Sequence, residues 1–243
     1  MNIIETHELT RVFGKKRAVD AATLAVEPGT VCGLLGQNGA GKSTLLKLLV
    51  GHLRPTSGRA MVAGQTVAGP CPELWRRVGY VAQARYLPGW MTAAECLRFA
   101  AGFHANWDAG KAADLARRLE LPLDERTRDL SRGLYARLQI ALAMGYNPEL
   151  LLLDEPTSGL DPVGRHELLS ILIEEIGHRG CTVVLSSHLV EDVERMADTM
   201  AIMDAGRVVA SGPVDAVKSG AAAGGPASSL EQAFFAYVNR RQA

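Results

Sequence analysis

Residues 36–43 follow the spacing G-x-x-x-x-G-K-S, which predicts a site for a nucleoside triphosphate and Mg²⁺. Glycines let the backbone bend around phosphates and turn its N–H groups inward. A lysine in this position supplies a mobile cation for the β- and γ-phosphates, and the following hydroxyl can ligate Mg²⁺. The residues we expect to contact nucleotide here are Gly36, Asn38, Gly39, Gly41, Lys42, Ser43 and Thr44.

The segments on either side of this loop fit the same interpretation. Residues 31–35 form a short apolar run that predicts a buried strand, and residues 44–50 predict a helix. The N-terminus of that helix would face the phosphates, where free N–H groups and the helix dipole favour an anion. A chance glycine-rich turn would lack this strand and helix, so we favour the phosphate site.

A second segment combines a buried strand with two carboxylates. Four consecutive leucines, residues 150–153, predict a strand inside a parallel sheet, and Asp154 and Glu155 follow at its carboxyl end. Open α/β sheets bind ligands at that end. We expect Asp154 to hold Mg²⁺ through water and Glu155 to polarise the attacking water. A leucine run ending in Asp-Glu is more often structural, and only the phosphate loop makes the functional interpretation strong.

With these two segments the chain resembles the nucleotide-binding subunits of ATP-binding cassette (ABC) proteins along almost its whole length. Lys42 and Ser43 match that family's phosphate loop, and Asp154 and Glu155 match its Mg²⁺ ligand and general base. Residues 156–161 resemble the following loop. The resemblance implies that Asp161 reaches across to a second subunit.

Three single residues also match the family by order and context. Gln83 fits the glutamine that senses Mg²⁺ and the membrane partner, and so becomes a second candidate metal ligand beside nucleotide. His188 fits the catalytic switch histidine that contacts the γ-phosphate, and Phe13 fits the aromatic that stacks on adenine. Taken alone, His188 would be an ordinary loop histidine and Phe13 an ordinary core aromatic.

The chain departs from the family at its hallmark L-S-G-G-Q, where residues 130–134 read Leu-Ser-Arg-Gly-Leu. Ser131 suits a helix N-cap, and the resemblance implies that Ser131 and Gly133 complete the ATP site of the other subunit. Arg132 adds a cation where glycine is usual, which resembles bacterial cassettes of ABC-2-type exporters and small antibiotic-responsive transporters. We expect Arg132 to act across the dimer as well, by attracting the other subunit's γ-phosphate or Asp161. We expect a working but slow site; the alternative is a degenerate half-site.

The resemblance implies an α/β fold, a P-loop NTPase (RecA-like) with a mostly parallel sheet core, an antiparallel β subdomain and an inserted α-helical subdomain. We expect the ATPase domain over residues 1–217, with the helical insertion at about 85–147. Residues 218–229 are flexible by composition. Residues 230–243 would form a C-terminal amphipathic helix and tail, because Leu230, Phe234 and Val238 recur at helical spacing.

Composition excludes some classes of function. Among 243 residues, Lys and Arg total 26 and so do Asp and Glu, so no bulk charge favours nucleic acid or an anionic membrane. Four scattered cysteines predict buried free thiols in a reducing compartment. No apolar run reaches the ~20 residues of a membrane span, and the first residues lack a signal-peptide pattern. We expect a cytoplasmic protein held at the inner face of the membrane by a partner.

Five aromatic residues that follow Gln83 could form the groove that receives that partner: Tyr86, Trp90, Phe99, Phe103 and Trp107. Phe99 and Phe103 lie four residues apart, and we expect them in the core of the helical subdomain. Tyr86 and Trp90, in a loop with proline and glycine, are the better docking candidates.

Together these features predict the ATP-hydrolysing subunit of an ABC transporter, an exporter, with transmembrane permease subunits on separate chains and no nucleic acid partner. Two copies, or this chain and a paralogue, would sandwich two Mg·ATP. The alternative is a soluble ABC ATPase without a transporter, such as a cluster-assembly ATPase. A simple P-loop kinase would explain Lys42 but not the segments at Ser131 and His188.

Overall fold

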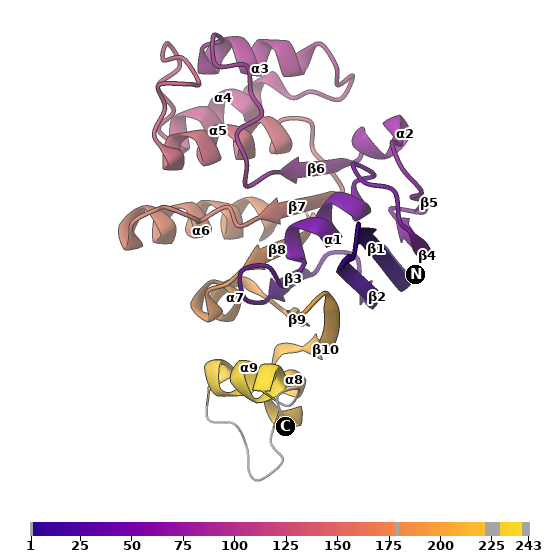
Figure 1. Cartoon of the computed structure of the whole chain (residues 1–243). Coiled ribbons are helices and arrows are strands. Elements are labelled where there is room, and N and C mark those ends of the chain that lie inside the picture. Colours follow the sequence, from indigo (N-terminus) through magenta and orange to yellow (C-terminus); the bar gives the residue numbers. More distant parts are fainter. Residues whose placement is uncertain (1, 178–179, 222–228, 240–243) are drawn as a thin grey trace.

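Parallel strands order the core of the molecule, which we describe from a computed structural model covering residues 2–177, 180–221 and 229–239. A six-stranded sheet has the order β10-β9-β3-β8-β7-β6, in which all neighbours pair in parallel except the antiparallel edge strand β10 (Figure 1). Its strands are β3 (Val31–Leu35), β6 (Val78–Val81), β7 (Leu150–Asp154), β8 (Thr182–Ser187), β9 (Thr199–Asp204) and β10 (Arg207–Pro213). The predicted, mostly parallel α/β core is confirmed.

A second sheet, of four strands, is antiparallel and has the order β2-β1-β4-β5. Its strands are β1 (Ile4–Phe13), β2 (Lys16–Val26), β4 (Ser57–Val62) and β5 (Gln65–Thr66). Gly14, with a φ of 56°, stands in the tight turn between β1 and β2. Helix α1 (Lys42–Leu49) lies between the two sheets, as Figure 1 shows. Helix α1 thus begins at Lys42, two residues before the expected start.

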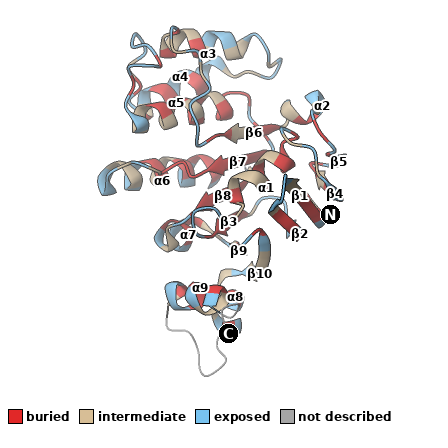
Figure 2. Cartoon of the chain, viewed as in Figure 1, coloured by how far each residue is buried: buried red, intermediate tan, exposed pale blue. Residues whose placement is uncertain are grey.

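The leucines of β7 show why the sheet is buried on both faces, a pattern visible in Figure 2. Side chains alternate along a strand. Leu150 and Leu152 therefore join α1 and the antiparallel sheet in one apolar core. Leu151 and Leu153 join a second core with α5 (Arg132–Met144) and α6 (Pro162–Gly177).

The chain between β6 and β7 contains three helices: α3 (Ala93–Ala101), α4 (Ala109–Arg118) and α5. They lie together at the top of Figure 1. Thr92 closes a capping box with Glu95 at the start of α3, and the Asp108 side chain accepts a hydrogen bond of 2.8 Å from Lys111 N at the start of α4. Asp108 is therefore the N-cap of α4.

The expectation for Phe99 and Phe103 was wrong. Their side chains are 59% and 68% exposed, and their rings contact each other edge to face, with centroids 4.9 Å apart. Helix α3 buries Ala93 and Cys96 instead, which turns Phe99 to the outside. Phe103 follows the end of the helix at Ala101.

The C-terminal part forms a third apolar cluster on the sheet edge near β9 and β10. Helix α9 (Leu230–Asn239) buries Leu230, Phe234 and Val238 against this cluster, and α8 (Val214–Gly220) packs beside it. The linker expected at 218–229 starts too early, because residues 218–220 form the last turn of α8. Residues 222–228 and 240–243 lie outside the described part of the chain.

The short helices α2 (Pro72–Trp75) and α7 (Val190–Met196) complete the elements of the described residues. All four cysteines are free; Cys32 and Cys96 are buried, whereas Cys71 and Cys181 are partly exposed, so the expectation of burial was wrong for two of them. Within the described ranges, no helix combines the length and the apolar character required to cross a bilayer.

Leu152→Ala should lower the free energy of unfolding by about 2–5 kcal/mol, because it opens a cavity in a fully buried core position. Chemical denaturation monitored by circular dichroism measures this change. Val163→Ala is the matched control: Val163 is 68% exposed on α6, so its effect should stay within about 0.5 kcal/mol. Equal losses in the two variants would contradict the assigned core.

Candidate active site

The phosphate loop joins the carboxyl end of β3 to the start of α1. Gly41 has a φ of 108°, and a Cβ there would lie 2.4 Å from the carbonyl oxygen of Ala18, so both conformation and space require glycine. Gly41 is also the N-cap of α1, and no side chain caps this end of the helix. The first N–H groups of α1 are therefore available for an anion.

Lys42 is buried at the centre of the loop, with only 4% of its surface exposed. Its Nζ donates to the carbonyl oxygen of Gly36 at 2.6 Å and lies 3.1 Å from Glu155 Oε1. A buried cation needs such partners because removal from water is costly. The ion pair thus brings the predicted phosphate-binding lysine and the predicted general base into direct contact.

Ser43 and Asp154 bring together two oxygen groups of the kind that bind Mg²⁺. The Ser43 hydroxyl donates to Asp154 Oδ1 at 2.9 Å, and the Ser186 hydroxyl donates to the same oxygen at 3.0 Å. Burial raises the pKa of the Asp154 carboxyl, and these two hydrogen bonds oppose the shift. A hydroxyl beside a carboxylate is a donor set of hard oxygens, which fits Mg²⁺ that keeps several of its waters.

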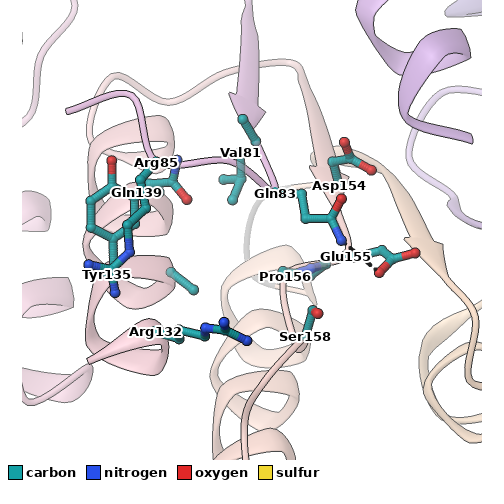
Figure 3. A pocket seen from close by; sticks show the side chains of 12 residues that line it. Val81, Gln83, Arg85, Arg132, Tyr135, Gln139, Asp154, Glu155, Pro156 and Ser158 are labelled. Atoms are coloured by element: carbon teal, nitrogen blue, oxygen red, sulfur yellow. Dashed lines mark hydrogen bonds between the residues drawn. The ribbon is translucent and has the colours of Figure 1, made fainter. Parts of the chain in front are cut away.

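Glu155 is the residue on which the site converges. Its Oε2 accepts a hydrogen bond from Gln83 Nε2 at 3.1 Å, drawn in Figure 3, and lies 3.3 Å from His188 Nδ1. The backbone of Glu155 has a φ of 49°, which is unusual for a residue with a side chain. Its N–H donates to Ser186 Oγ at 3.0 Å, which fixes this conformation. The side chain is thereby aimed at the phosphate loop.

A cavity of about 550 Å³ is lined by most of the residues that were predicted to bind nucleotide. Its lining includes Asn38, Gly39, Gly41, Lys42, Ser43, Thr44, Gln83, Glu155 and His188. Lys16 and Ala18 of β2 also line it, and sequence reasoning missed them because no motif marks them. The only available signal was the position of Lys16 directly after a glycine turn.

Phe13 does not lie in that lining. Its side chain is 43% exposed at the end of β1, with the Arg11 guanidinium 4.6 Å from the ring centroid. Phe13 pairs across the turn with Lys16, which lines the cavity, and Arg11 covers one face of the ring. The role of Phe13 in stacking on adenine stays a prediction.

The residues expected to act on a second subunit also lie outside the nucleotide cavity. Ser131 Oγ accepts from Leu134 N at 3.2 Å and so caps α5 as predicted, and Asp161 Oδ1 accepts from Gly164 N at 2.8 Å. Ser131 and Arg132 are exposed. Exposure agrees with contacts to another subunit, which remain a prediction.

The start of α5 packs closely on the loop that follows Glu155. A Cβ on Gly133 would lie 2.4 Å from Leu160 Cδ2, and a Cβ on Gly159 would lie 3.1 Å from Arg132 Cδ. Two consecutive residues of one segment therefore fit against two of the other. The two segments form one continuous surface.

Comparison with known proteins agrees with this geometry. The family model described as ABC transporter matches residues 19–158. The Nod factor export ATP-binding protein I of Cupriavidus metallidurans is 36% identical over 215 residues, covering 86% of this chain and 71% of the relative. The bacitracin transport ATP-binding protein BcrA of Bacillus licheniformis is 33% identical, covering 89% and 71%. The probable multidrug ABC transporter ATP-binding protein YbhF of Escherichia coli is 35% identical; the match covers 98% of this chain but 42% of that longer protein.

Solved structures show the same architecture. The structure of an ATP-binding subunit of an ABC transporter superposes with a TM-score of 0.86 at 28% identity, covering 97% of this chain and 99% of the other. The chain belongs to the ABC transporter family. It is an ATP-hydrolysing, nucleotide-binding subunit, and no finding favours a soluble ATPase without a transporter.

Lys42→Ala should weaken ATP binding by tenfold or more, since it removes a buried cation from beside two phosphates. Titration with a fluorescent ATP analogue measures the affinity. Lys15→Ala, at an exposed turn position, is the control and should bind as the parent does. Equal affinities of the Lys42 variant and the parent would remove Lys42 from the site.

Glu155→Gln should slow ATP turnover by about 10²–10⁴-fold while retaining ATP binding, because an amide cannot take a proton from water. Steady-state phosphate release measures turnover. Glu73→Gln, at an exposed position of α2, should leave the rate unchanged. Turnover of the Glu155 variant within a few-fold of the parent would exclude Glu155 as the general base.

Proposed function

We propose that this chain is the motor subunit of an exporter, working with transmembrane subunits on separate chains at the cytoplasmic face of the membrane. The observation that carries the proposal is the convergence of Lys42, Gln83 and His188 on Glu155. Such an arrangement links nucleotide state to the loop after Gln83. Names of relatives, which include Nod factor export, bacitracin transport and multidrug transport, favour export over import.

ATP would bind with its phosphates on the loop and Mg²⁺ held by Ser43 and Asp154. Lys42 would exchange its contact with Glu155 for the β- and γ-phosphates and offset their charge. Glu155 would then be free to orient a water molecule and accept its proton, with His188 beside the γ-phosphate. Gln83 would follow this exchange, since its amide also contacts Glu155.

A dimer would complete two such sites. Segments bearing Ser131, Gly133 and Asp161 would face the nucleotide of the other subunit, either a second copy or a paralogue. One solved structure shows an ABC cassette as a dimer in a post-hydrolysis state, bound to ADP and phosphate. Its TM-score with this chain is 0.78 and its sequence identity is 22%, so the likeness supports the fold alone. Closure driven by ATP and opening after hydrolysis would supply the mechanical stroke.

The surface for the membrane subunit is a groove of about 460 Å³ beside Gln83. Tyr86 and Leu87 of the loop line it, together with Met91, Phe99 of α3 and Leu142 of α5. Tyr86 is 66% exposed, and this apolar lining suits a short amphipathic helix of the partner. Trp90, also predicted to dock, is 69% exposed but does not line the groove.

Tyr86→Ala and Phe99→Ala should each reduce co-purification with the transmembrane subunit by about tenfold, because large exposed aromatic side chains contribute most at interfaces. Pull-down with a transmembrane subunit that co-purifies with the parent protein measures the effect. Phe235→Ala is the control, since Phe235 is 46% exposed on α9 and lies outside the groove lining. Undiminished binding by both groove variants would place docking elsewhere on the subunit.

A further inference from the structure

A second cavity, of about 360 Å³, adjoins the nucleotide cavity on the side of α5. Both cavities are lined by Gln83, Glu155 and Ser158. They therefore meet at the residues that surround the γ-phosphate end of the site. Figure 3 shows this second cavity between α5 and the segment that contains Pro156 and Ser158.

Two arginines give the second cavity a cationic wall. The Arg132 side chain extends toward Ser158 in Figure 3, and the described residues provide no hydrogen bond or ion pair for its guanidinium. Arg85 is already engaged: its Nη2 donates to the Leu130 carbonyl at 2.9 Å, and its guanidinium lies 4.8 Å from the Tyr135 ring centroid. Arg132 is thus the cation more available to an anion.

The inner end of the cavity carries the opposite charge. Glu155 is held by Lys42, Gln83 and His188, and Asp154 is held by two serine hydroxyls. Once Lys42 has turned from Glu155 to the nucleotide, the two carboxylates repel an anion at this inner end of the cavity, and Arg132 attracts it at the other end. Within the second cavity the charges therefore favour an anion at the Arg132 end, away from Asp154 and Glu155.

We propose that this cavity receives the inorganic phosphate produced by ATP hydrolysis, with Arg132 as its principal binding residue. Hydrolysis breaks the bond between the γ-phosphorus and the bridging oxygen, and the water oxygen completes the phosphate. ADP keeps its contacts with the phosphate loop, whereas the free phosphate lies at Gln83 and Glu155, where the second cavity opens. The inference rests on the ATPase cycle described above.

This placement differs from a contact between Arg132 and the nucleotide of a second subunit. A site within one subunit binds phosphate in the monomer with ADP present, with no need for ATP-driven dimerisation. A contact across a dimer alters only dimer formation and turnover. Phosphate affinity of the ADP-bound monomer therefore separates the two roles.

The test is a calorimetric titration of the Mg·ADP-loaded protein with inorganic phosphate at constant ionic strength, which measures the Kd for phosphate. Arg132→Met keeps the aliphatic part of the side chain against Gly159 and removes the charge. It should raise the Kd for phosphate about fivefold or more, and Arg132→Lys should restore most of the affinity. Arg85→Met should have a smaller effect, because its guanidinium is already engaged.

Arg59→Met on the exposed end of β4 is the control for net charge and should leave the Kd unchanged. The proposal would be overturned if the Arg132→Met variant bound phosphate with the same Kd as the parent. It would also be overturned if Arg132→Met and Arg59→Met lost phosphate affinity to the same extent. Circular dichroism and ADP affinity of each variant show whether it is folded. Absence of ATP turnover in the parent would instead count against the ATPase cycle, and the phosphate titration would still locate the anion.

Discussion

Parallel pairing of β3, β8, β7 and β6 is the constraint on which the site depends. Leu35 is level with Ser187, Asp154 with Ser186, and Val81 with Leu153, so all four strands end at one edge. Each strand is followed there by a different functional group: the phosphate loop, His188, Glu155 and Gln83. The leucines that bury β7 on both faces hold these groups in register, and apolar packing thus supports the polar chemistry.

The fold and the phosphate site could be predicted because their signals are local. Each of the two motifs is continuous in the sequence and includes the elements that position it. One is a glycine loop between a strand and a helix, and the other is a leucine run that ends in two carboxylates. Gln83 and His188 both contact Glu155, although Gln83 precedes it by 72 positions in the sequence and His188 follows it by 33. Only the resemblance to ABC proteins suggested this convergence.

Other features depend on packing that no local pattern describes. Phe99 and Phe103 have core-like spacing, yet the small residues Ala93 and Cys96 take the buried face of α3. Lys16 reaches the nucleotide cavity because the antiparallel sheet packs beside the phosphate loop. Composition suggested a linker from residue 218, whereas helix α8 continues to Gly220, since a single glycine at a helix end costs little.

The close fit of Gly133 on Leu160 and of Arg132 on Gly159 also has a thermodynamic consequence. Two segments that would face another subunit are already held against each other in the single chain. Association then has to restrict fewer backbone and side-chain rotations, so less conformational entropy is lost when the subunits meet. A larger share of the binding energy of ATP remains for moving the subunits and, through them, the membrane partner.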